Sequence, residues 1–167
     1  MKVTISHEFN CDADTFWNKV FFDPEFGQAV YKGELGFPQY EVIEDRDEGN
    51  ERVRRIRVMP KQEAPAAVQK LVGGAFSYVE EGRFDKTTKR YRFRVVPSAM
   101  GDKIRTDGEL RVETLGPKKI RRLVDMTIEV KIFGIGGMVE GFVSKSTQDS
   151  YARAAAFTNR WIAEKNL

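Results

Sequence analysis

The segment that decides the fold is residues 103–132, KIRTDGELRVETLGPKKIRRLVDMTIEVKI. In its first half Ile104, Leu110 and Val112 fall on one face, and charged side chains fall on the other. The second half, after the turn at 116–117, alternates in the same way. Its apolar positions are Ile120, Val124, Met126, Ile128, Val130 and Ile132. This period of two predicts two antiparallel strands, each with one face in the core.

The same period recurs upstream of this segment. It predicts a first strand at residues 2–10, followed by strands at 37–47, 51–59, 75–84 and 89–97. Turn-like stretches rich in Gly, Asn, Asp and Pro separate these strands. Residues 60–74 break the series, and we expect a short helix there that follows Pro65 and ends at Gly73-Gly74. Short turns between successive strands favour an antiparallel meander.

Helical signals flank the strands on both sides. Asp12 and the pair Asp23-Pro24 are start signals for two short helices, the second ending near Lys32-Gly33. Over the last part of the chain, apolar and small residues recur at helical spacing and predict one long helix over about 136–164. Its first turns contain several glycines, which weaken a helix. The glycines permit a close approach of the sheet or of a ligand, or they form a hinge.

These elements predict one α+β domain over residues 1–167, with a seven-stranded antiparallel sheet. A twisted sheet must cover its apolar face. The helix at 136–164 is the only predicted element long enough to do so. We therefore expect that helix to pack across the sheet.

Composition excludes several classes of site. The 167 residues include one cysteine, Cys11, and one histidine, His7, so an internal disulfide and a Cys/His zinc site are excluded. No nucleotide-binding or nucleophile-elbow motif is present, and we expect no cofactor and no metal. Apolar runs are far below the ~20 residues of a membrane span, and no signal peptide is visible, so we expect a cytoplasmic location.

The charge is unevenly distributed. Residues 1–51 carry 4 basic and 12 acidic side chains, whereas the whole chain has a net charge of +3. The basic remainder leaves room for transient contact with an anionic membrane surface. Nucleic acid is not an expected partner, because Tyr91 and Phe93 fall on the strand face opposite Arg92 and Arg94. We interpret most of these charges as solvated outer faces of strands.

The order of elements resembles the START-like, or Bet v 1-like, helix-grip superfamily. The resemblance covers essentially the whole chain, from the opening strand and Phe16-Trp17 to Gly136-Gly137-Met138-Val139-Glu140. Within it, the tail Phe157-Thr158-Asn159-Arg160-Trp161 is similar to a bacterial family known by a domain-of-unknown-function label. The resemblance implies a curved sheet gripping the last helix, with a cavity between them. It implies no catalytic residue.

Three functional hypotheses follow. The first is binding or transport of a hydrophobic small molecule, a lipid or a polyketide-like compound. The second is a cyclase- or hydratase-type enzyme in which Glu80, Tyr78 or His7 performs acid–base chemistry. The third is a module that binds a protein. For the first hypothesis we expect the pocket to be lined by Phe76, Tyr78, Glu80, Phe93, Arg122, Met126, Ile128, Met138 and Phe142.

Ionisable residues in phase with the apolar positions need partners, solvent or a ligand. A hairpin that pairs residue 47 with residue 51 places Glu44 opposite Arg54, and we expect an ion pair there. Arg122, as an anchor in the pocket, favours a carboxylate or phosphate head group. We expect His7 to be a structural residue of the first strand. We likewise expect Cys11 to be a plain buried cysteine rather than a reactive thiol.

Overall fold

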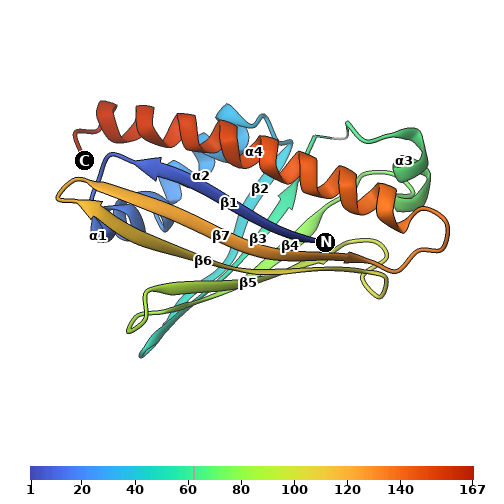
Figure 1. Cartoon of the computed structure of the whole chain (residues 1–167), viewed down its shortest axis with the longest axis horizontal. Helices are drawn as coiled ribbons and strands as arrows, with labels where there is room; N and C mark the ends of the chain where they lie inside the picture. The colour runs from blue at the N-terminus through green and yellow to red at the C-terminus, as the bar shows by residue number, and fades with distance from the viewer. Residues whose placement is uncertain (62) are drawn as a thin grey trace.

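The computed structural model describes residues 1–61 and 63–167, and contains a seven-stranded antiparallel sheet with a long helix across one face (Figure 1). Strand order is β1-β7-β6-β5-β4-β3-β2. The strands are β1 (Lys2–Phe9), β2 (Gln39–Glu48), β3 (Glu51–Met59), β4 (Tyr78–Asp85), β5 (Arg90–Pro97), β6 (Ile104–Gly116) and β7 (Lys119–Val130). The predicted helix-grip architecture is confirmed.

The alternation of residues 103–132 produces β6 and β7 as predicted. The apolar residues of β7 from Ile120 to Val130 are buried, and the residues between them reach the opposite face. β7 lies between β6 and β1, so the first strand of the chain pairs with the last. This pairing brings His7 directly opposite Arg122. β7 ends at Val130, two residues earlier than predicted.

Two short helical segments connect β1 to β2. α1 (Ala13–Thr15) continues into the wider π-helical turn η1 (Phe16–Phe21), and α2 (Pro24–Gln28) continues into η2 (Ala29–Glu34). Both predicted start signals are confirmed: the carboxylate of Asp12 accepts from the Thr15 amide, and that of Asp23 accepts from the Glu25 and Phe26 amides.

The long helix α4 (Gly136–Glu164) packs against β1, β7 and η2. Val139, Ala155 and Ile162 are among its buried residues and join the main core. α3 (Ala66–Val72) forms after Pro65 and ends at Gly73, as predicted, and is at the same end of the molecule as the beginning of α4 (Figure 1). Among the described residues, no helix has both the length and the apolar character needed to cross a membrane.

The predicted pairing of Glu44 with Arg54 is wrong. The β2–β3 hairpin turns at Gly49 and Asn50, so Glu48 pairs with Glu51 and Asp45 pairs with Arg54. A bulge between Val42 and Glu44 restores the predicted register for the rest of β2. Glu44 therefore contacts Arg55 and Arg46 on the outer face, whereas Arg54 points into the core.

The glycines at the beginning of α4 differ in their surroundings. A Cβ atom on Gly136 would lie 2.7 Å from the carbonyl oxygen of Val130, whereas one on Gly141 would meet nothing within 4 Å. Gly136 therefore permits the close approach of the sheet to the helix. Gly141 has no such steric role.

We expect Gly141→Ala to raise the free energy of unfolding by up to about 1 kcal/mol, because alanine is the better helix former. Gly136→Ala should lower it, since the added methyl group collides with the Val130 backbone. Denaturant unfolding of both variants provides the measurement. A destabilised Gly141→Ala protein would contradict this account of the helix start.

Candidate functional site

The interior face of the sheet carries a carboxylate, that of Glu80 on β4. The hydroxyl of Tyr91 on β5 donates a hydrogen bond of 2.7 Å to Glu80 Oε1, and Nη2 of Arg54 on β3 lies 4.0 Å from the same oxygen. The side chain of Glu80 is 15% exposed and that of Arg54 is 9% exposed. Charges this far from solvent require partners. Three adjacent strands thus combine to hold one negative charge.

Gly82 on β4 makes this arrangement possible. A Cβ atom at Gly82 would lie 1.8 Å from the hydroxyl oxygen of Tyr91. The Tyr91 ring therefore lies over Gly82, two residues along β4 from Glu80, and its hydroxyl reaches the carboxylate. A side chain at position 82 would displace the ring and break the hydrogen bond.

Arg54 is positioned by the turn η1. Its Nη1 donates to the carbonyl oxygen of Phe21 at 2.8 Å, and its Cζ atom lies 4.4 Å from the Phe21 ring and 5.2 Å from the Phe22 ring. Burial alone lowers the pKa of Arg54, but Tyr91 and Glu80 outweigh this effect and leave the pKa above its ordinary value. The guanidinium is thus a fixed positive charge beside the Glu80 carboxylate.

All five tyrosines of the chain lie within electrostatic reach of Glu80. They come from η2, β2, β4, β5 and α4, and are Tyr31, Tyr40, Tyr78, Tyr91 and Tyr151. Burial raises the pKa of each phenol, and the negative charge of Glu80 adds to the effect, bringing the pKa of Tyr151 to about 12. All five therefore remain neutral at physiological pH and can donate hydrogen bonds.

A second charged group on the interior face of the sheet is the side chain of Arg122 on β7. Its Nη2 is 3.0 Å from Nδ1 of His7, and its Cζ is 5.0 Å from the Phe9 ring and 4.9 Å from the Tyr151 ring. Arg122 is 7% exposed, and its buried Nε has no hydrogen-bond acceptor among the described residues. Burial lowers the pKa of Arg122 to about 10, and it also lowers the pKa of His7, with a contribution from the Arg122 charge.

The predicted pocket residues fall into three groups. Phe93, Met126, Ile128 and Phe142 belong to the main core. Tyr78 packs against a smaller cluster that contains Tyr40, Ile56 and Val58, and its ring centroid is 6.4 Å from that of Phe76. Glu80 and Arg122, the charged members of the predicted set, both lie on the interior face of the sheet.

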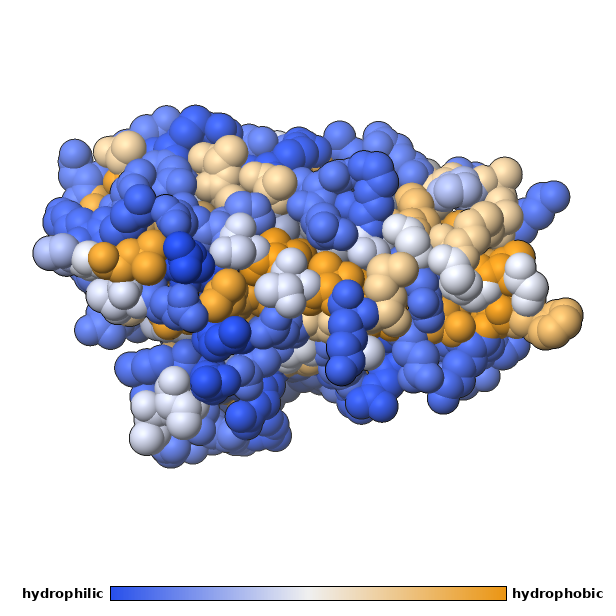
Figure 2. Space-filling view, viewed as in Figure 1, coloured by the Kyte–Doolittle hydropathy of each residue, from blue (hydrophilic) through white to orange (hydrophobic). Residues whose placement is uncertain are grey.

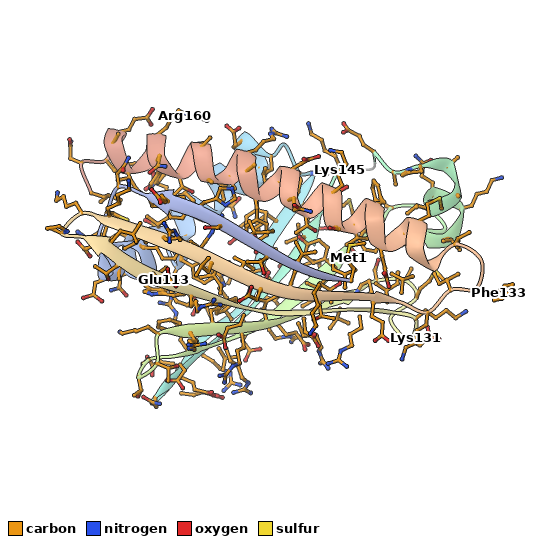
Figure 3. The ribbon with its side chains drawn as sticks, viewed as in Figure 1. Met1, Glu113, Lys131, Phe133, Lys145 and Arg160 are labelled. Atoms are coloured by element: carbon orange, nitrogen blue, oxygen red, sulfur yellow. The ribbon has the colours of Figure 1, made fainter. Side chains whose placement is uncertain are left out.

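Met138 does not join these residues, because it is 44% exposed in the first turn of α4. At 100° per residue, the helix turns the adjacent Val139 toward the core instead. Phe133, in the preceding loop, projects fully into solvent at the end of the molecule (Figure 3). Other apolar residues are exposed at the same end, where α3 and this loop lie (Figure 2).

Sequence reasoning missed two contributors to the interior, Tyr31 and Tyr151. Tyr31 stacks on Tyr40 with a centroid distance of 4.4 Å and an interplanar angle of 8°. Tyr151 lies on α4, where its ring packs against the main core and against Arg122. A search for tyrosines at positions in phase with the buried face would have found Tyr151, but nothing local in the sequence brings Tyr31 to Tyr40.

Other candidate groups have structural roles. Burial and the neighbouring Asp12 raise the pKa of Cys11 to about 11, so its thiol stays protonated. On the outer face, Arg92 lies 3.1 Å from Glu109, and Arg94 lies 2.7 Å from Glu81. These arginines are thus paired with acidic side chains, while Tyr91 and Phe93 are buried on the opposite face.

Comparison with known proteins gives the family and the fold. A family model described as "Protein of unknown function (DUF2505)" matches residues 4–162. The chain belongs to this family. No curated protein sequence matches it.

Several solved structures share the fold of this DUF2505 chain. An aromatase/cyclase from Streptomyces sp. R1128 is 16% identical with a TM-score of 0.65, and the match covers 97% of this chain and 95% of that one. Norcoclaurine synthase from Thalictrum flavum, in complex with dopamine and hydroxybenzaldehyde, is 15% identical with a TM-score of 0.67 and coverages of 98% and 87%. A START superfamily protein from Mycobacterium smegmatis is 16% identical with a TM-score of 0.60 and coverages of 95%. The predicted START-like fold is confirmed.

The Tyr91–Glu80 hydrogen bond should be measurable as a coupling energy. We expect Tyr91→Phe to lower the free energy of unfolding by about 1.5–3 kcal/mol, because a charged acceptor loses its donor. The same substitution in a Glu80→Gln background should cost less, since the acceptor is then neutral. Denaturant unfolding of the two single variants and the double variant completes the cycle. Strictly additive effects would show that the two groups do not interact.

His7 should make stability depend on pH. Its pKa is lower in the folded state than in the unfolded chain, so the unfolded chain binds the proton first as pH falls. The contribution of His7 to the free energy of unfolding should therefore be fully present above the unfolded pKa of about 6.5. It should decrease as the pH falls below that value, until His7 of the folded protein is also protonated. In His7→Asn, whose amide oxygen can replace Nδ1 as an acceptor for Arg122, this decrease should be smaller. Thermal unfolding between pH 5 and pH 8 provides the test, and equal pH profiles for both proteins would refute it.

Proposed function

We propose that this protein binds a hydrophobic small molecule between the sheet and α4. The observation that carries the proposal is the polar group on the interior face of the sheet, where Tyr91 donates to the Glu80 carboxylate, Arg54 lies 4.0 Å from it, and the other four tyrosines are within electrostatic reach. Tyr78, Glu80 and Tyr151 retain partial solvent exposure although they point inward. A purely structural core gains little from such polar groups, because each must be desolvated. A ligand site uses them, since a few polar groups in apolar walls orient a bound molecule.

The fold comparisons support the same proposal. The aromatase/cyclase and the norcoclaurine synthase share this fold, and the latter structure contains dopamine and hydroxybenzaldehyde. Dopamine and hydroxybenzaldehyde are both small aromatic molecules. The aromatic interior of this chain, in which the Phe93 ring stacks on that of Tyr91 and Phe142 packs against the main core, suits a lipid or a polyketide-like compound.

Entry of a ligand requires a covering element to move. We assign this role to α3 and the beginning of α4, which cover the same end of the molecule (Figure 1). α3 contributes only Val68 and Leu71 to the main core, and it is followed by Gly73 and Gly74 at positive φ. An element with few buried side chains opens at lower cost than the strands do.

A second candidate function, acid–base catalysis of the cyclase or hydratase type, is favoured by one observation. The 2.7 Å bond between Tyr91 and Glu80 joins a proton donor and a proton acceptor at one place inside the fold. Glu80 would accept a proton from a bound substrate, and a neutral tyrosine would donate one. The two functions are separable, since Glu80→Gln should abolish turnover but retain binding if the protein is an enzyme.

Binding can be tested with N-phenylnaphthylamine, a neutral dye whose fluorescence rises in apolar surroundings. We expect saturable binding to the wild-type protein and weaker binding to Phe142→Trp, because the larger side chain occupies space among the core residues. Phe133→Trp is the matched control, since Phe133 is fully exposed and the substitution should leave dye affinity unchanged.

Organic extraction of the purified protein, followed by mass spectrometry, provides an independent readout. A co-purifying hydrophobic compound would support the proposal. If the dye does not bind and the extract contains no such compound, the interior is a closed core, and the third hypothesis, a module that binds a protein, gains support.

A further inference from the structure

Among the described residues, two arginines, Arg54 and Arg122, are buried on the interior face, and the carboxylate of Glu80 lies beside the first of them. Arg54 lies 4.0 Å from Glu80, which compensates its charge. Arg122 is equally buried, and no carboxylate of the described residues lies within ion-pair distance of it. Its neighbour His7 has a lowered pKa and is neutral near pH 7. The interior therefore carries a net positive charge at Arg122.

The contacts of Arg122 hold its guanidinium without neutralising it. Nδ1 of His7 lies 3.0 Å from Nη2 of Arg122. The ring centroids of Phe9 and Tyr151 lie 5.0 Å and 4.9 Å from its Cζ atom. The Nε donor is buried without an acceptor in the part of the chain that the structure describes. A buried donor without a partner is costly, and a buried lone charge is costlier. The group is thus fixed in orientation and lacks an anionic acceptor.

We propose, as an extension of the proposed function, that Arg122 binds the anionic end of an amphiphilic ligand, a carboxylate or a phosphate monoester. A guanidinium recognises both groups through paired, charge-assisted hydrogen bonds. The apolar body of the ligand would lie along β7, where Met126 and Ile128 follow Arg122 on the same face. Four to six residues of strand correspond to about 13–20 Å, which suits a medium-length chain.

This arrangement also fixes the direction of binding. Ile128 lies toward the end of β7 that precedes α4, whereas Arg122 lies nearer the opposite end. The acidic group would enter first, past α3 and the beginning of α4, and the tail would remain at the entrance. Tyr151, whose ring contacts Arg122, has a neutral hydroxyl that can serve as an additional donor to the anion.

The test is competition against bound N-phenylnaphthylamine by dodecanoic acid, dodecyl phosphate and dodecanol. The three share one alkyl chain and differ in the head group. For the wild-type protein we expect the better of the two anions to displace the dye at a concentration at least about tenfold lower than dodecanol does. If dodecanoic acid is the stronger competitor, the subsite prefers a carboxylate. If dodecyl phosphate is the stronger one, it prefers a phosphate.

Arg122→Met should remove this preference and leave displacement by dodecanol unchanged or improved. Arg121→Met is the matched control, because Arg121 immediately precedes Arg122 in β7, lies on the outer face and pairs with Glu8. It should retain the wild-type preference. Arg122→Lys keeps the positive charge and should therefore retain part of the preference for anionic competitors.

The outcomes separate the two proposals. If no dye binds to the wild-type protein, the proposed function fails. If the dye binds but dodecanol competes as well as both anions, the anion subsite is refuted while the binding function stands. That comparison uses only the wild-type protein and holds even if Arg122→Met does not fold. A preference for anions that survives Arg122→Met would also overturn the assignment.

Discussion

The pairing of Glu80 with Tyr91 and Arg54 is the interaction on which the interior depends. A carboxylate inside a protein must find donors, and here neighbouring strands supply both of them. Each donor imposes a further condition. Tyr91 needs a glycine beneath its ring, and Arg54 needs the Phe21 carbonyl and the rings of η1. One charge thus links the middle of the sheet to the helical segments that precede β2.

The two buried arginines show how context changes the meaning of the same side chain. Arg54 forms part of a compensated pair, and a pair of this kind serves a structural role without any ligand. Arg122 has an imidazole and two rings instead of a counterion. A fold that is shared with a cyclase, a synthase and a START protein does not by itself select carrier or enzyme. The distribution of charge on the interior face therefore says more about the function of this chain than the fold does.

The fold could be predicted from the sequence because its signals are local. Alternation in residues 103–132 and the capping residues Asp12 and Asp23 report on backbone conformation within a few residues. The position of Glu44 was missed because a bulge and the choice of turn residues shift a register without changing the apolar pattern. The inward positions of Glu80 and Arg122 could be predicted because both residues alternate in phase with the apolar residues of their strands. The stacking of Tyr31 on Tyr40 did not, since it depends on how η2 docks on the sheet.

Gathering all five tyrosines around Glu80 has a spectroscopic consequence. None of them is fully exposed, and Tyr40 and Tyr91 are buried, so the phenol chromophores of the chain report mainly on the interior. Changes in tyrosine absorbance therefore monitor the interior face of the sheet with little background from the surface. The protein carries its own optical probe of that face.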